Sequence, residues 1–283
     1  MNWNLRYAPH LGYRPPFQPL FAATLGTDDP VAHVQFAAEQ RFAGVLYAAA
    51  RGRSAAEQER VGREIADRGL EAGCIPYTTF DQLRNTAWAT DSEDARKWIA
   101  GEIGEAIAAA KRVGARRLAV LGGADPQRPI ALQHVVFMEH LRRAGDIVAR
   151  EGMMLVLESL SRKSMPNMLL HHIGDGYAVV KGARHPAVRL IFDTSHVQVM
   201  DGDLLYQLEQ TWDVVEIIQL ADNPGRLEPG SGEINFENVL RALKQRDYAG
   251  LVELEYGWQT PGRESERRGL ETLRRLDAAL GAE

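Results

Sequence analysis

Four strand-like apolar segments in the second half of the chain each end in a carboxylate or an amide. Glu158 ends MMLVLES, Asp193 ends VRLIFD, Gln219 lies at the end of VVEIIQL, and Glu255 lies at the end of LVELEY. A carboxylate buried in such a place costs several kcal/mol unless it is paired or bound to a cation. Carboxylate and amide oxygens are hard ligands that suit Mg²⁺ or Mn²⁺. The segment ends therefore indicate a divalent-metal site.

Two other interpretations of these residues stay open. Any one of the four can cap a neighbouring helix or form a salt bridge with a nearby arginine. Glu253 also precedes Glu255 by two positions, so the alternation of a strand places both side chains on the same face and their roles can be exchanged. Glu255 is nearer the carboxyl end of its segment, and we therefore expect it to be the metal ligand.

Two further side chains follow these segment ends. His196 comes three positions after Asp193 in DTSHVQVMDGD, and we expect it on a loop from which it reaches a bound substrate. The alternative is a surface or packing histidine. Arg226 lies in NPGRLEPG, where its guanidinium can hold a hydroxyl, carboxylate or phosphate group of a substrate, or can pair with Glu228.

The remaining metal-type and nucleophilic side chains have simpler interpretations. His171 and His172 are adjacent and point in different directions, so we expect them at a loop or a helix start rather than as a metal pair. Cys74 is the single cysteine, which excludes an intrachain disulfide, and we expect a core residue rather than a catalytic thiol.

Short apolar segments that alternate with helical patterns must position these residues. The predicted strands are Asn4–Ala8, Gly44–Ala49, Glu71–Tyr77, Arg117–Gly122, Met153–Glu158, Val188–Asp193, Val214–Leu220 and Gly250–Tyr256. The predicted helices are Pro30–Gln40, Ser54–Arg68, Ser92–Val113, Pro129–Arg150, Leu204–Glu209, Phe236–Gln245 and Arg263–Leu280.

This alternation indicates βαβ units and a parallel sheet. Eight units in 283 residues predict an α/β fold of the closed (β/α)8 TIM barrel type, with an open doubly wound sheet as the alternative. A G-x-G-x-x-G sequence is missing from the first strand-to-helix turn, which disfavours a dinucleotide-binding sheet. In a barrel, the segment ends would share the active-site rim, and the long segments Pro9–Asp29 and Thr78–Asp91 would lie there too.

The composition of the chain limits the classes of partner that we expect it to bind. The net charge is −5 and the pI is about 5.9, so a nucleic-acid partner is disfavoured and a small molecule is expected. The N-terminal residues contain no apolar region of signal-peptide type, and no run of 18 apolar residues occurs. We therefore expect a cytoplasmic protein without a membrane partner.

Three motifs in residues 153–260 occur in an order typical of a known family. The motifs are FDTSHVQVMDGD, IIQLADNPGRLEPGSGEINF and LVELEYGW. This region resembles the hydroxypyruvate isomerase branch of the xylose-isomerase-like sugar isomerase and epimerase superfamily. The resemblance implies one TIM-barrel domain over residues 1–283 that binds one divalent ion, Mn²⁺, Mg²⁺ or Co²⁺. It implies the metal ligands Glu158, Asp193, Gln219 and Glu255, acid and base roles for Glu158 and Glu255, and substrate contacts from His196 and Arg226.

The chain departs from the family at two places. The first glutamate lies in LESLSRKSMPN rather than in a Glu-Pro-x-Asn context, and RYAPHLGYRPPFQPLF replaces the usual opening. Both differences affect the substrate pocket more than the metal site.

The expected reaction is proton transfer next to a carbonyl. A divalent ion would stabilise an enediolate of a keto sugar or a small hydroxy-keto acid, and two glutamates would serve as base and acid, which gives isomerisation or epimerisation. The alternatives are a lyase that eliminates a group β to the carbonyl of a keto sugar or 3-keto glycoside, a metal-dependent nuclease, and a non-catalytic sugar-binding barrel. Barrels of this kind often associate, so a homo-oligomer is compatible with the sequence.

Overall fold

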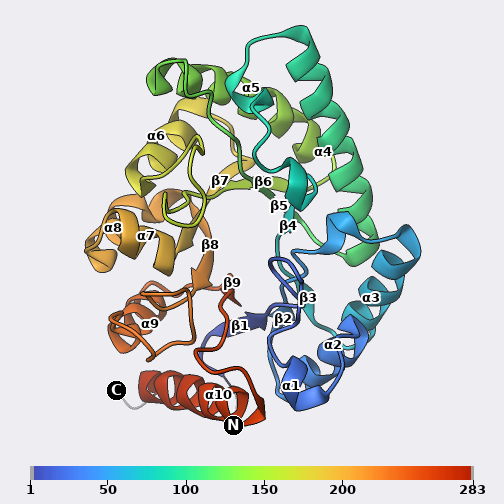
Figure 1. Cartoon of the computed structure of the whole chain (residues 1–283), viewed down its shortest axis with the longest axis vertical. Coiled ribbons are helices and arrows are strands. Elements are labelled where there is room, and N and C mark those ends of the chain that lie inside the picture. Colours follow the sequence, from blue (N-terminus) through green and yellow to red (C-terminus); the bar gives the residue numbers. More distant parts are fainter. Residues whose placement is uncertain (1–2, 282–283) are drawn as a thin grey trace.

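The computed structural model describes residues 3–281 as a ring of short parallel strands surrounded by helices (Figure 1). One sheet has seven strands in the order β1-β9-β8-β7-β6-β5-β4, and β2 pairs with β3. The strands are β1 Arg6–Pro9, β2 Gly44–Val45, β3 Glu71–Ala72, β4 Ile75–Pro76, β5 Arg117–Val120, β6 Met154–Leu157, β7 Val188–Asp193, β8 Val215–Leu220 and β9 Leu251–Leu254.

Backbone hydrogen bonds join the pair β2–β3 to the larger sheet. Ala43 N–H donates to the carbonyl of Tyr7 at 2.9 Å, and Leu46 N–H donates to the carbonyl of Pro9 at 3.0 Å, which connects β2 to β1. On the other side, β3 continues into β4, which pairs with β5. The ring is therefore closed, the predicted TIM barrel is confirmed, and the open sheet is wrong.

The third predicted strand, Glu71–Tyr77, is divided into β3 and β4. The interruption lies at Gly73 and Cys74. Cys74 N–H donates to the carboxylate of Glu253 at 2.7 Å, so a side chain takes the bond that a neighbouring strand would otherwise accept. Gly73 leaves room for it, because a Cβ atom there would lie 2.5 Å from Glu253 Oε1.

The helices occupy the outside of the ring. They are α1 Ala22–Leu25, α2 Pro30–Glu39, α3 Ala55–Asp67, α4 Glu93–Val113, α5 Ile130–Ala149, α6 Ile173–Ala183, α7 Thr194–Met200, α8 Leu204–Thr211, α9 Phe236–Gln245 and α10 Arg263–Ala278. The seven predicted helices are present with small shifts at their ends, whereas α1, α6 and α7 were not predicted. None of the helices in residues 3–281 is both long and apolar enough to cross a membrane.

Helix α4 shows how the sequence determines where a helix begins, where it ends and which face it buries. Ser92 caps its start by accepting the N–H of Ala95 at 3.1 Å, and the helix ends at Gly114, whose φ of 78° suits glycine. Its residues Ile99, Ile103 and Ile107 repeat every four positions and are buried. Their burial turns this face of the helix towards the barrel.

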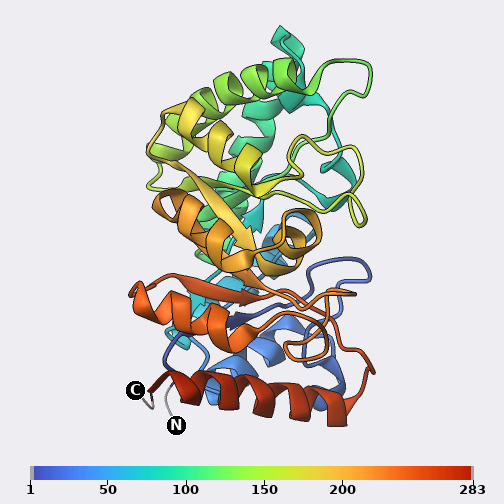
Figure 2. The ribbon, with the colours of Figure 1, turned by 90° about the vertical axis from the view of Figure 1, so that its left-hand side faces the viewer.

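Long connections follow several strands and gather on one side of the barrel (Figure 2). The segments Pro9–Asp29 and Thr78–Asp91 are among them, and both contribute residues to the cavity described below. Their predicted place at the rim is therefore confirmed.

Candidate active site at the carboxyl ends of the strands

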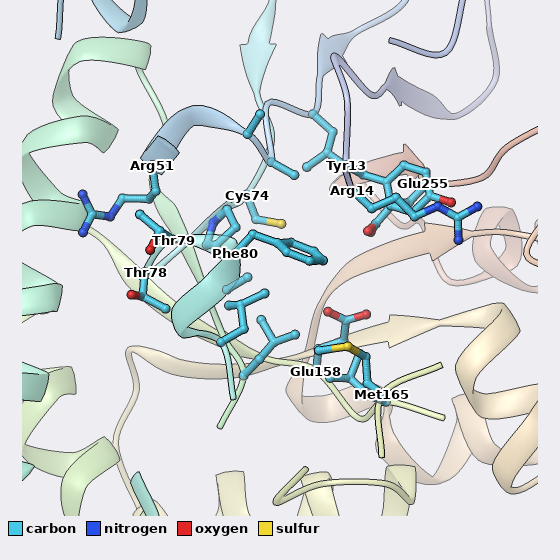
Figure 3. A pocket seen from close by; sticks show the side chains of 18 of the residues that line it. Tyr13, Arg14, Arg51, Cys74, Thr78, Thr79, Phe80, Glu158, Met165 and Glu255 are labelled. Carbon is cyan, nitrogen blue, oxygen red and sulfur yellow. The ribbon is translucent and has the colours of Figure 1, made fainter. Parts of the chain in front are cut away.

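The six side chains predicted from the sequence come together at one cavity of about 370 Å³. Five of them line it, and Asp193 contacts one of those five, Arg226. Figure 3 shows Glu158 and Glu255 on different sides of the space into which the Phe80 ring projects. Small-molecule sites have volumes of about 300–1,000 Å³, so the cavity can hold a metabolite. The five lining residues are Glu158, His196, Gln219, Arg226 and Glu255.

The register of three neighbouring strands explains part of this arrangement. Asp193 of β7 pairs with Gln219 of β8, which pairs with Glu253 of β9. Residues in register on parallel strands point to the same face. All three side chains are buried inside the barrel, and Glu255, two positions after Glu253, extends from the same face to the cavity.

Arg226 forms the central ion pair of the site. It donates to both Asp193 oxygens, at 2.7 Å and 3.0 Å, and lies 3.4 Å from Glu255. Burial alone would raise the pKa of Asp193, but the Arg226 charge, with His196 and their hydrogen bonds, holds it below its usual value. The salt-bridge interpretation therefore holds for Asp193. The suggested Arg226–Glu228 pair is replaced by these contacts, and Glu228 accepts the N–H of Gln259 instead.

Asp193 has a second structural role, because it caps helix α7. Its Oδ1 accepts the N–H of His196 at 2.8 Å. His196 therefore lies in the first turn of a helix, and its predicted place on a loop is wrong. Helix α7 is difficult to predict from the sequence because Asp193 both ends β7 and caps the start of α7.

His196 is held with a defined orientation. Its Nδ1 accepts the N–H of Ser161 at 3.2 Å. Nε2 lies 3.5 Å from Glu158 and 3.2 Å from Arg226. Burial lowers the pKa of His196 to about 4, against the attraction of Asp193, and the ring is neutral near pH 7. The ring is therefore fixed at the cavity by contacts to both of its nitrogens.

Gln219 is oriented by a buried carboxylate. Its Nε2 donates to Glu253 Oε2 at 3.0 Å, and the same carboxylate accepts the backbone N–H of Cys74 at 2.7 Å. A carboxylate offers only acceptors when ionised, so the amide turns Nε2 towards Glu253 and Oε1 the other way. Both Glu253 oxygens are thus occupied, whereas Glu255 lines the cavity, which favours the predicted preference for Glu255.

Cys74 is buried, as predicted for a core residue. Burial and the charge of Glu253 raise the pKa of its thiol, so the nucleophilic thiolate is disfavoured. His172 is the N-cap residue of α6 and His171 lies just before it, in agreement with the predicted helix start.

Several atoms of the site fit a cation. Gln219 Oε1 and Glu255 Oε2 are buried without a hydrogen-bond partner among the described residues. An unpaired buried oxygen is costly, and a divalent ion would satisfy both. Glu158, Asp193 and His196 also each place one donor atom within 4.8 Å of the others, a spacing that can hold a metal ion. The chemistry of the donor set therefore fits a divalent metal.

The two cavity glutamates have unusual proton affinities. Burial raises the pKa of Glu158 well above its usual value, and the charges of Glu255 and Asp193 add to the effect. Burial also raises the pKa of Glu255 to about 8, although Arg226 opposes the shift. Carboxyl groups with perturbed pKa values that face one cavity are typical of acid and base sites.

The loop that carries Arg226 is organised by one buried carboxylate, Asp222. Its two oxygens accept four backbone N–H groups, at 2.8–3.1 Å. Arg226 itself has a φ of 58°, a left-handed conformation that is unusual outside glycine. The four donors belong to Asn223, Gly230, Gly232 and Ile234.

Sequence patterns did not indicate the contribution of Tyr13 and Arg14. Both line the cavity from the segment after β1, and the Tyr13 hydroxyl is buried without a hydrogen-bond partner among the described residues. The Tyr13 ring contacts the guanidinium groups of Arg14 and Arg226, at 5.1 Å and 5.6 Å. The only indication in the sequence was the predicted position of the segment Pro9–Asp29 at the rim.

Known proteins share this fold and part of the sequence. Hydroxypyruvate isomerase from Escherichia coli K12 is 30% identical over 159 residues, which are 56% of this chain and 62% of that protein. The chain thus spans about three fifths of this relative. Among solved structures, an AP endonuclease of family 2 from Brucella melitensis has a TM-score of 0.78 at 24% identity over 92% of this chain and 96% of that one. A 3-keto-D-glucoside 4-epimerase from E. coli has a TM-score of 0.76 at 19% identity over 96% of this chain and 99% of that one.

The sequence profile of one family covers most of the chain. The profile of the xylose isomerase-like TIM barrel matches residues 31–276. The matched range includes β2 to β9, and with them every strand that carries one of the six predicted side chains. The chain therefore belongs to the xylose isomerase-like TIM barrel family.

Proposed function

We propose that the protein is a metal-dependent isomerase or epimerase of a hydroxy ketone, either a keto sugar or a small hydroxy-keto acid. The observation that carries the proposal is the pair Glu158 and Glu255, a buried and a largely buried carboxyl group that both line one cavity. Proton removal next to a carbonyl and its return need such a base and acid. The sequence relative described above supports the same class of reaction.

Four side chains of the cavity have a place in this reaction. One of the two glutamates removes the proton beside the carbonyl, and the other returns a proton to the same or the neighbouring carbon. Arg226 and His196 hold substrate oxygens, and Arg226 stabilises the negative charge of the enediolate. The outcome is epimerisation or aldose–ketose isomerisation.

The metal would be held by Glu158, Asp193, Gln219 and Glu255. The partnerless oxygens of Gln219 and Glu255 support this set, and its oxygen donors suit Mn²⁺, Mg²⁺ or Co²⁺. When bound, such an ion supplies Lewis-acid polarisation of a carbonyl oxygen. Asp193 already pairs with Arg226, so the arginine and the ion share one carboxylate.

Deuterium exchange tests the proposal directly. Keto sugars and hydroxy-keto acids are incubated with the Mn²⁺-loaded protein in D₂O, and NMR detects deuterium at the carbon beside the carbonyl. Glu255→Gln should lower the exchange rate by about 10²- to 10⁴-fold, because the amide cannot move a proton. Glu271→Gln, on the exposed face of α10, is the matched control and should exchange normally.

Two results would contradict the proposal. Near-normal exchange in metal-loaded Glu255→Gln would remove this residue from proton transfer. Sugar binding without exchange, unaffected by chelator, would identify a non-catalytic binding barrel. Product analysis in the same experiment separates isomerisation from elimination.

A further inference from the structure

The lining of the cavity has two chemically different parts. The carboxylates, His196 and Arg226 come from β6 to β9 and the elements that follow them. The rest of the lining includes side chains that we call the apolar wall, which come from the segments after β1, β2, β4 and β5. The apolar wall comprises Phe17, Leu46, Phe80, Leu83 and Leu121.

The charged groups beside the apolar wall are already engaged. Arg51 donates to Glu102 at 3.0 Å and to the carbonyl of Tyr77 at 3.3 Å, and its guanidinium points away from the Phe80 ring (Figure 3). Thr78 also donates to Glu102, at 2.6 Å. Arg51 is therefore not available to a substrate phosphate or carboxylate beside the apolar wall. Arg14 lies against Tyr13, and Tyr13 contacts Arg226.

Phe80 is an exposed aromatic residue of the apolar wall. Its side chain is 43% exposed, although its ring projects into the cavity and contacts the ring of Phe17 edge to face at 5.9 Å. Water-exposed aromatic surface inside a cavity is stabilised when an apolar ligand covers it. Aromatic rings also favour other rings in offset or edge-to-face contact.

The cavity can hold more than the polar group of a substrate. Its volume of about 370 Å³ lies within the range of about 300–1,000 Å³ of small-molecule sites, and its lining continues from the carboxylates to the apolar wall.

The geometry points to a substrate with two parts, a hydroxy ketone that faces the carboxylates and an aryl group that packs against the apolar wall. A keto sugar joined to an aromatic group has this form. The inference rests on the proposed function for the reacting part, while the aryl subsite is defined by Phe80 and its neighbours.

Matched substrates test the aryl subsite. Two keto hexosides that differ only in a methoxy or a phenoxy substituent are compared in the exchange assay with the Mn²⁺-loaded protein. The phenoxy compound should have a kcat/KM higher by about tenfold or more. Phe80→Ala should remove most of this preference, through a higher KM for the phenoxy compound. Tyr206→Ala, which removes an aromatic side chain that is 53% exposed on α8, is the control and should keep the preference.

Binding without turnover separates this inference from the proposed function. The phenoxy alcohol that lacks the carbonyl cannot exchange, and calorimetry on metal-free protein should show that it binds at least about tenfold more tightly than its methoxy counterpart. That result with no exchange of any hydroxy ketone would support the aryl subsite and contradict the proposed reaction. Equal affinities and equal kcat/KM values would overturn the aryl subsite. A stronger preference for a carboxylate substituent, lost in Arg14→Ala, would also overturn it.

Discussion

At the scale of single residues, the site depends on carboxylates that have more than one partner. Asp193 caps α7, pairs with Arg226 and is a proposed metal ligand. Glu253 binds a backbone N–H, a thiol and the Gln219 amide, and leaves Glu255 to the cavity. The sequence predicted which residue types meet, because strand ends of a barrel share one rim, but it did not predict which of them pair.

Glu253 should control metal affinity without contacting the metal. In Glu253→Gln, the new amide can donate as well as accept, so the Gln219 side chain is free to turn its nitrogen towards the cavity. We expect the affinity for Mn²⁺ to fall by about tenfold or more, as for other partners of metal ligands. Calorimetric titration of the variant measures the change.

A partly exposed carboxylate of β8, which lies away from the cavity, provides the comparison. Glu216→Gln alters the ion pair with Arg117 and should leave Mn²⁺ affinity unchanged. Unaltered affinity in Glu253→Gln would mean that the Gln219 amide is fixed by other contacts.

At the scale of elements, the sequence predicted most of the barrel and missed three helices, among them α6 and α7. Helix α6 was missed because IGDGYAVVKGA contains three glycines, which lower helix propensity. Tertiary contacts account for two of these glycines, since a Cβ at Gly176 would lie 2.8 Å from Ser159 Oγ, and one at Gly182 would lie 2.5 Å from Met138. Helix α7 was missed because its seven residues give too short a pattern.

The loop after β8 is predicted to depend on Asp222. Asp222→Ala removes the acceptor of four backbone N–H groups, and we expect the free energy of unfolding to fall by about 3 kcal/mol or more. Arg226 would lose its fixed position, so kcat/KM should fall as well. Urea denaturation and limited proteolysis within residues 223–234 measure the two effects on the loop.

An exposed ion pair provides the control substitution for Asp222→Ala. Asp213→Ala removes a partner of Lys181 that is 53% exposed, and it should cost less than about 1 kcal/mol. A similar small cost in Asp222→Ala would show that the loop keeps its shape without this carboxylate.

At the scale of the whole molecule, a buried histidine joins the ends of the first and the last strand of the chain. His10 follows β1, donates from Nε2 to the carbonyl of Tyr256 after β9, and accepts the N–H of Gly12 on Nδ1. If the ring took up a second proton, this proton would lie on Nδ1 and would face the Gly12 N–H, which is also a donor. Burial lowers the pKa of His10 from 6.5 to about 4, and nearby Arg226 and Arg14 act in the same direction.

This histidine should make the fold sensitive to acid. The unfolded chain takes up the proton near pH 6.5 and the folded chain only near pH 4, so the stability that His10 contributes is complete above pH 6.5 and is lost as the pH falls towards 4. The difference of about 2.5 pKa units corresponds to about 3 kcal/mol. His10→Gln keeps a donor for Tyr256, and its stability should depend less steeply on pH in this window.

Urea denaturation at several pH values between 7 and 4 provides the measurement. His172→Gln, at the more exposed start of α6, should retain the slope of the parent protein. A slope in His10→Gln equal to that of the parent would assign the acid sensitivity to other groups.

The different origins of the cavity residues have a consequence for how the pocket can change. The carboxylates, His196 and Arg226 come from β6 to β9 and the segments that follow them, whereas Phe17 and Phe80 belong to connections after β1 and β4. Grafting different segments at Pro9–Asp29 or Thr78–Asp91 would therefore alter the pocket wall while Glu158 and Glu255 keep the strands that carry them. Directed evolution for new substrates should accordingly accumulate its substitutions in these two connections.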